Sequence, residues 1–127
     1  MFVEEVPRFE VPVPFVPRVT TTRVNVRGRT IDEGTSILVG LGAANRDPKR
    51  YVEPDQFDPS RIAPNFTFGI GRHRCLGSHL ARLELRLVLE EWHRRIPNYS
   101  LEPDAELKVP WPAGTLALTR LPLRMGH

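Results

Sequence analysis

The chain has 127 residues, of which 40% are hydrophobic and 26% are charged, so its composition is that of one globular domain and excludes wholesale disorder. The net charge is +3, but acidic residues are interleaved with the arginines, so we expect no nucleic-acid partner. No apolar stretch approaches the ~20 residues of a membrane span, the start lacks the basic region of a signal peptide, and the single cysteine fits a reducing compartment, which together favour a cytoplasmic protein.

The first segment, residues 2–9, is expected to form the last turns of a helix. Glu5 and Arg8 stand three positions apart, so both lie on one helix face and can share an ion pair with a third partner. Pro7 lies between them and is tolerated if the helix begins near Glu4, whereas a longer helix would lose a hydrogen bond there.

Closely spaced prolines then break regular structure and force an extended path as far as Arg18. Four apolar side chains lie along this path, and the sequence allows them to face either a cavity or the core. They are Val11, Val13, Phe15 and Val16.

The middle of the chain is expected to contain short strands and a long irregular segment. Residues 19–26 and 30–31 are rich in valine and threonine and flank a turn at 27–29, a pattern that predicts a β-hairpin. Residues 35–39 predict another strand or the approach to a short helix. Residues 49–67 contain several prolines and little periodicity, which predicts an irregular meander.

Cys75, the only cysteine, follows a glycine-punctuated loop at residues 68–74 and precedes a helical run. A sulfur in this place, with Arg72, His73 and Arg74 beside it, is expected to favour the thiolate. A soft anionic sulfur at a helix start is a good axial ligand for haem iron.

Other interpretations of this loop fail on spacing. A dinucleotide fingerprint would need glycine where Arg74 stands, and a phosphate-binding cysteine loop would need arginine at Ala81. Zinc would need further ligands at a suitable spacing, which the sequence lacks. A buried structural cysteine remains an alternative.

A long helix is predicted from Ser78 to Ile96, where Pro97 ends it. Its apolar residues form two stripes, so we expect other parts of the fold to pack against the helix on two sides. The stripes are Leu80, Leu83, Leu87 and Leu85, Leu89, Trp92, Ile96. The side chains expected to face solvent are Arg82, Arg86 and His93, with ion pairs Glu90–Arg94 and Glu91–Arg95. The tail suggests a turn at 112–114 and a strand at 115–119.

Residues 68–77 match the pattern Phe-x-x-Gly-x-Arg/His-x-Cys-x-Gly, and on this motif the chain resembles the cytochrome P450 family. The run at 43–48, Ala-Ala-Asn-Arg-Asp-Pro, is similar to the soluble bacterial branch of that family. The resemblance implies an α+β chain that is the C-terminal part of the mainly α P450 fold. Residues 1–127 would form a single incomplete domain comprising a helix end, β-hairpins, the meander, the cysteine loop, a long helix and a C-terminal β-hairpin.

The resemblance also assigns site residues. Cys75 would bind the iron of haem b, iron protoporphyrin IX, and the other cofactor-binding residues would be Phe68, Gly69, Gly71, His73, Gly77 and Arg18. Of these, Arg18 and His73 would contact the propionates, and residues 13–16 would touch substrate. Glu5, Arg8 and Arg61 would form a structural cluster that locks the cysteine loop.

The function implied is that of a haem-thiolate monooxygenase, which inserts one oxygen atom from O2 into a small organic substrate. A ferredoxin or reductase would supply electrons, steered to the basic side chains of Arg72, Arg74, Arg82 and Arg86. The family's oxygen-activating distal helix has no counterpart in the sequence, so no catalytic residue is assigned and the chain is interpreted as a fragment. The alternative is a non-catalytic remnant that binds haem weakly or not at all.

Overall fold

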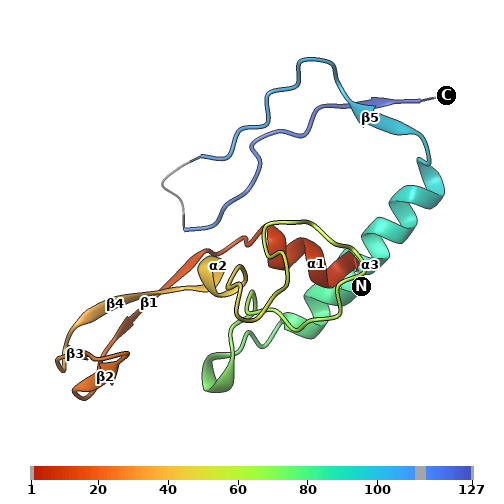
Figure 1. The fold of residues 1–127 in the computed structure, drawn as a ribbon. Coiled ribbons are helices and arrows are strands. Elements are labelled where there is room, and N and C mark those ends of the chain that lie inside the picture. Colours follow the sequence, from red (N-terminus) through yellow and green to blue (C-terminus); the bar gives the residue numbers. More distant parts are fainter. Residues whose placement is uncertain (1, 111–113, 127) are drawn as a thin grey trace.

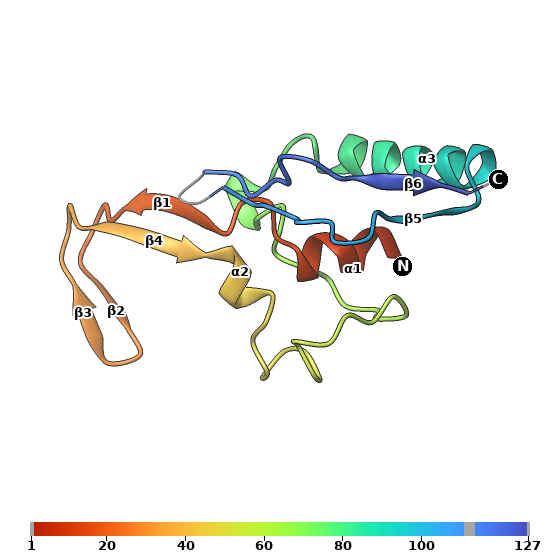
Figure 2. The same cartoon turned by 90° about the horizontal axis from the view of Figure 1, so that it is seen from above.

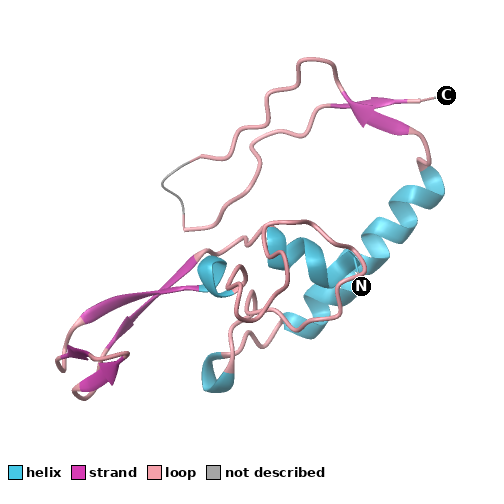
Figure 3. Ribbon diagram, in the orientation of Figure 1, coloured by secondary structure: helices cyan, strands magenta, loops and turns pink. Residues whose placement is uncertain are grey.

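A computed structural model describes residues 2–110 and 114–126 as a mixed α and β chain (Figure 1). Its helices and strands are separated by long loops (Figure 3). The elements, in chain order, are α1 (Phe2–Phe9), β1 (Phe15–Val19), β2 (Val24–Val26), β3 (Arg29–Ile31), β4 (Ser36–Gly40), α2 (Leu41–Ala44), the 3₁₀ turn η1 (Gly71–His73), α3 (Ser78–Arg95), β5 (Tyr99–Leu101) and β6 (Leu123–Met125).

Helix α1 occupies the segment predicted to be helical and turns Glu5, Pro7 and Arg8 inward. Because the helix begins at Phe2, Pro7 lies beyond the first turn. It therefore costs the helix the N–H bond that would reach the Val3 carbonyl. The inward face is mostly polar, so specific partners rather than hydrophobic burial must hold α1 in place.

The strands form three separate two-stranded antiparallel sheets. Strand β1 pairs with β4, with Val16 opposite Val39, and the β2–β3 hairpin lies at the far end of this pair (Figure 2). The hairpin turns through Arg27 and Gly28, whose φ angles are 50° and 79°. Positive φ at both central residues is the geometry that fits a two-residue hairpin.

The predicted first strand of this hairpin, residues 19–26, is too long. Thr20, Thr21 and Thr22 are not in a strand: Val19 ends β1, and β2 begins only at Val24. The Thr20 hydroxyl donates to the Asp32 carbonyl at 2.6 Å, and its backbone bonds to the loop at 34–35. These bonds tie Thr20 to residues 32–35, next to the β1–β4 pair, so Thr20 belongs to the end of that pair and not to the hairpin.

The irregular meander is confirmed, since residues 45–70 contain neither helix nor strand. The long helix is confirmed as α3, one residue shorter than predicted, and Pro97 follows it closely. The strand predicted at 115–119 is wrong: the described tail pairs at β5–β6 instead. The Leu116 N–H donates to the Pro12 carbonyl rather than to a neighbouring tail strand. The turn predicted at 112–114 begins outside the described residues.

Tight packing is concentrated between α1 and the meander. Among the described residues, the fully buried side chains there include Glu5, Arg8, Asn45 and Tyr51. The chain exposes 9972 Å², whereas a compact 14.5 kDa monomer exposes about 6,900 Å². The exposed side chains include leucines of both predicted α3 stripes: Leu80, Leu83, Leu85 and Leu87. None of the described helices is both long and apolar enough to cross a bilayer.

Candidate functional site

A cavity of about 510 Å³ brings together three segments that are far apart in the sequence. One wall comes from the proline-rich path and β1, another from β4 and the start of α2, and the third from the cysteine loop. Its lining residues are Pro12, Val13, Val16, Arg18, Val39, Leu41, Thr67, Phe68, Gly69, Ile70, His73 and Cys75. The cavity is therefore largely apolar, with one thiol, one guanidinium and one imidazole among its lining groups.

The cysteine loop is closed by backbone hydrogen bonds. The Cys75 N–H donates to the Phe68 carbonyl at 2.8 Å, and the Arg74 N–H donates to the Gly71 carbonyl at 3.1 Å. Gly69 and Gly71 have φ angles of 69° and 65°, a region that side chains rarely adopt. The two glycines let the chain turn tightly enough for Cys75 to face the same cavity as Phe68.

The opposite wall follows from strand geometry. Side chains two apart share a face of a strand, which places Val16 and Arg18 together on the cavity side of β1. Val39 stands opposite Val16 across the β1–β4 pair and lines the same cavity. Of the four apolar side chains predicted to face a cavity or the core, Val13 and Val16 line the cavity, and Val11 is buried in the core. The prediction is wrong for Phe15, which is 47% exposed and does not line the cavity.

A sequence model of the cytochrome P450 family matches residues 1–125, that is, nearly the whole chain. The chain belongs to the cytochrome P450 family. The resemblance inferred from the cysteine motif is thereby confirmed.

The P450 relatives are bacterial and archaeal proteins about three times as long as this chain. The biotin biosynthesis cytochrome P450 of Bacillus subtilis is 40% identical over 122 residues, which cover 95% of this chain and 31% of that protein. Cytochrome P450 119 of Sulfurisphaera tokodaii is 46% identical over 94 residues, covering 73% of this chain and 26% of the relative.

Solved P450 structures share the fold. P450BioI in complex with hexadec-9Z-enoic acid ligated acyl carrier protein superposes with a TM-score of 0.90 and 38% identity, covering 97% of this chain and 32% of that one. CYP109E1 from Bacillus megaterium in complex with testosterone gives a TM-score of 0.94 and 31% identity, covering 99% and 35% of the two chains. The chain thus spans about a third of the P450s it matches.

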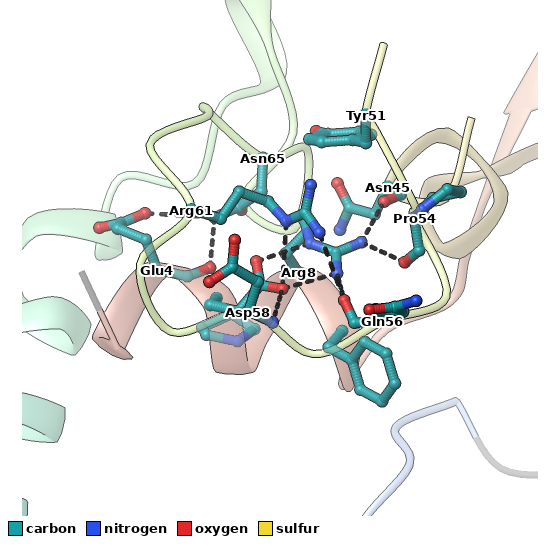
Figure 4. Close-up of polar contacts among 12 residues, drawn as sticks. Glu4, Arg8, Asn45, Tyr51, Pro54, Gln56, Asp58, Arg61 and Asn65 are labelled. Atoms are coloured by element: carbon teal, nitrogen blue, oxygen red, sulfur yellow. Dashed lines mark hydrogen bonds and ion pairs between the residues drawn. The ribbon is translucent and has the colours of Figure 1, made fainter. Parts of the chain in front are cut away.

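A buried ionic cluster holds α1 against the meander (Figure 4). Arg8 donates two hydrogen bonds to the Glu5 carboxylate, both at 2.7 Å, while Arg61 donates to it at 3.3 Å. The Asp58 N–H adds a further bond to Glu5 at 3.0 Å. The remaining Arg8 and Arg61 donors reach five carbonyls of the meander: Asn45, Val52, Glu53, Pro54 and Gln56. Each buried charge is therefore both paired and hydrogen-bonded.

This environment keeps Glu5 ionised. Burial by itself opposes ionisation, but the hydrogen bonds from Arg8, the Asp58 N–H and Arg61 outweigh burial and lower the pKa of Glu5 from 4.5 to about 2. The hydrogen bond to Glu5 in turn raises the pKa of Arg8 above its ordinary value. The pair is ionic throughout the physiological pH range.

Five of the residues predicted to bind the cofactor converge on the cavity: Arg18, Phe68, Gly69, His73 and Cys75. Gly71 and Gly77 are not among its lining residues. Gly71 contributes through its backbone angle, whereas Gly77 precedes α3 with a φ of −75°. A methyl group on Gly77 would lie 3.9 Å from the Cys75 Sγ, an ordinary contact distance.

One prediction about the surface beside Cys75 is wrong. Arg82 does not point to solvent: it forms an ion pair with Glu4 on α1, and its guanidinium lies 4.5 Å from the centre of the Phe68 ring. Arg82 therefore connects α3 and the cysteine loop to α1. Arg72 and Arg74 are exposed, as the proposed docking of an acidic partner requires.

Sequence reasoning missed two buried residues that support the site. Asn45 and Tyr51 are at most 2% exposed. Asn45 accepts from Arg8 through its carbonyl, and the Tyr51 hydroxyl donates to the Pro64 carbonyl at 2.8 Å. Asn45 belongs to the run at 43–48 that resembles bacterial P450s, so the sequence did mark this position. The run does not indicate which residues Asn45 would hydrogen-bond to.

Proposed function

We propose that the chain supplies the sulfur side of a haem-thiolate monooxygenase, in which Cys75 would bind the iron of haem b. The observation that carries this proposal is the convergence of Cys75 with Arg18 and His73 on one apolar cavity. A thiolate suits iron, the Arg18 guanidinium and the His73 imidazole suit the propionates as an ion-pair partner and a hydrogen-bond partner, and apolar walls suit a porphyrin ring. The donor set and the cavity therefore fit the cofactor that the family implies.

Each residue has a distinct role in this proposal. The Cys75 sulfur would bind the iron, and the Phe68 ring would pack against the macrocycle. Gly69 and Gly71 hold the loop flat enough for close approach, and Gly77 leaves room at the start of α3. Arg18 would form an ion pair with one propionate, and a ring nitrogen of His73 would hydrogen-bond to a propionate. The bound haem would supply the iron at which O2 is reduced and one oxygen atom is transferred to an organic substrate.

The substrate proposed is a small apolar organic molecule, because Val13, Val16 and Val39 line the cavity. The relatives fit this class: one solved structure holds testosterone, and another holds a fatty-acyl acyl carrier protein. Electrons would come from an acidic ferredoxin or a reductase docking near Arg72 and Arg74. The free thiol that haem ligation needs fits a cytoplasmic setting.

The chain is proposed to act as the C-terminal haem-binding portion of a P450, as a single domain that is incomplete by itself. It spans about a third of its relatives, and oxygen activation would depend on the parts of the fold that lie outside this span. The alternative of a remnant without haem binding is less well supported, because the cavity and the Glu5–Arg8–Arg61 cluster are both in place.

Haem titration of the purified chain tests the proposal. With carbon monoxide and reductant, the complex should show the red-shifted Soret band that is typical of thiolate ligation. The variants Cys75→Ala and Cys75→Ser should lose this band, whereas His79→Ala, which changes an exposed residue beyond the loop, should retain it. An identical spectrum for Cys75→Ala and the parent chain would refute ligation by Cys75.

A further inference from the structure

A hydrogen-bonded link connects the end of α2, the cysteine loop and α1. Asn45 is fully buried, and its amide oxygen accepts from the Phe66 N–H at 2.6 Å. Its amide nitrogen donates to the Thr67 hydroxyl at 2.9 Å, and that hydroxyl donates to the Pro7 carbonyl at 2.7 Å. We call this chain of contacts the Asn45–Thr67 link.

The direction of every bond in the link is fixed by its ends. The Pro7 carbonyl lies in the last turn of α1, where it has no helical partner, and it can only accept. The single Thr67 proton must therefore go to Pro7, so Thr67 must accept from Asn45. At the other end the Phe66 N–H can only donate, which requires the Asn45 oxygen there. The side chain at position 45 thus needs a hydrogen-bond acceptor and a donor next to each other. Among side chains as small as asparagine, only the amide provides both.

The link acts on the residues that close the cysteine loop. Thr67 directly precedes Phe68, whose carbonyl accepts from the Cys75 N–H at 2.8 Å. Phe66, which Asn45 holds from one side, accepts from the Gly69 N–H through its own carbonyl, also at 2.8 Å. The segment that leads into the loop is therefore anchored at two consecutive residues, Phe66 and Thr67, by the Asn45 side chain and by the Pro7 carbonyl.

We propose that Asn45 and Thr67 are positioning residues for the Cys75 sulfur, which they hold in place through Phe66 and Phe68. They also connect the loop to the buried ionic cluster, because the Asn45 carbonyl accepts from Arg8 at 2.8 Å (Figure 4). The effect of the link on haem binding rests on the proposed function, whereas its effect on the order of the loop does not. A fixed loop presents the sulfur without a further ordering cost when the cofactor binds.

Two substitutions separate the link from general packing. Thr67→Val keeps the shape and removes the hydroxyl, while Thr67→Ser keeps the hydroxyl and serves as its matched control. Asn45→Asp keeps the shape but puts an acceptor where Thr67 needs a donor. Its control is Asn25→Asp in the exposed hairpin, where the side-chain oxygen still accepts from the Gly28 N–H.

Hydrogen exchange of the haem-free chain, measured residue by residue by NMR, is the test. Thr67→Val and Asn45→Asp should speed exchange of the Gly69 and Cys75 amides about tenfold, with amides at the centre of α3 unchanged. Thr67→Ser and Asn25→Asp should leave all of these rates within about twofold of the parent. Unchanged Cys75 exchange in both link variants would overturn the proposal. An equal rise throughout α3 would also overturn it, since the link would then support only general stability.

A haem titration of the same variants keeps this proposal separate from the proposed function. Slower and weaker thiolate-type binding in Thr67→Val, restored in Thr67→Ser, is the expected result. If the parent chain does not bind haem through Cys75, the proposed function fails while the exchange result still decides the role of the link.

Discussion

Replacing Glu5 with glutamine should destabilise the chain more than any exposed charge substitution, because it leaves Arg8 charged and buried without its partner. The Glu5 and Arg8 side chains are each 1% exposed. Breaking a buried pair from one side costs about 3–5 kcal/mol in unfolding free energy. The amide that Glu5→Gln introduces would also turn one of its donors toward the Arg8 donors, so the substitution cannot restore the bidentate contact.

The lowered pKa of Glu5 corresponds to a similar free energy of unfolding. A fall from 4.5 to about 2 corresponds to about 3 kcal/mol of stability from ionised Glu5. Because the folded state binds this proton more weakly than the unfolded chain, the contribution is complete above about pH 5 and is lost as the pH falls toward about 2. Both values predict that α1 loses stability when the cluster is no longer ionic.

Urea unfolding of the haem-free chain between pH 7 and pH 2 measures both effects. The parent should lose about 3 kcal/mol more than Glu5→Gln across the acid range. Glu5→Gln should already be less stable at pH 7. The matched control is Glu91→Gln on the exposed face of α3, where the partners are Arg94 and Arg95 and little change is expected. Equal stability of Glu5→Gln and the parent at pH 7, or parallel pH profiles, would refute the reasoning.

Three further predictions concern the loop, the surface and activity. Gly69→Ala should weaken haem binding and lower stability by about 1–2 kcal/mol, because φ is 69° and the new methyl group would lie 3.4 Å from the His73 carbonyl. Gly77→Ala should leave the stability of the haem-free chain almost unchanged, because its φ is −75° and the new methyl group meets only the Cys75 Sγ at 3.9 Å; an equal loss of stability for both variants in calorimetry would contradict this. The exposed leucines of α3 should make the isolated chain bind a hydrophobic dye and self-associate at micromolar concentration, and a dye-free monomer in light scattering would contradict that. The chain alone should form no hydroxylated product above a free-haem control, because a one-sided pocket leaves bound oxygen open to water, and product above that control would disprove it.

Local features of the fold were the ones that sequence could predict. Pro97 marks the end of α3, and Arg27-Gly28 provides a turn whose angles fit its hairpin. The cysteine motif could be recognised because each of its fixed positions has a local task, such as the positive φ of Gly69. These signals depend on residues close to one another in the chain.

Features that depend on distant partners were missed or misjudged. Nothing in residues 15–19 or 36–40 specifies that β1 and β4 pair with each other. Arg82 has helical spacing typical of a solvent-facing residue, yet it forms an ion pair with Glu4, which is far away in the sequence. Asn45 likewise gains its importance only when the meander folds back and brings Phe66 and Thr67 beside it.

Iron-edge X-ray absorption of the chain loaded with haem b tests the central claim most directly. We predict one sulfur scatterer in the iron coordination shell of the parent chain and its loss in Cys75→Ala. A shell of nitrogen and oxygen scatterers alone in the parent chain would contradict the account.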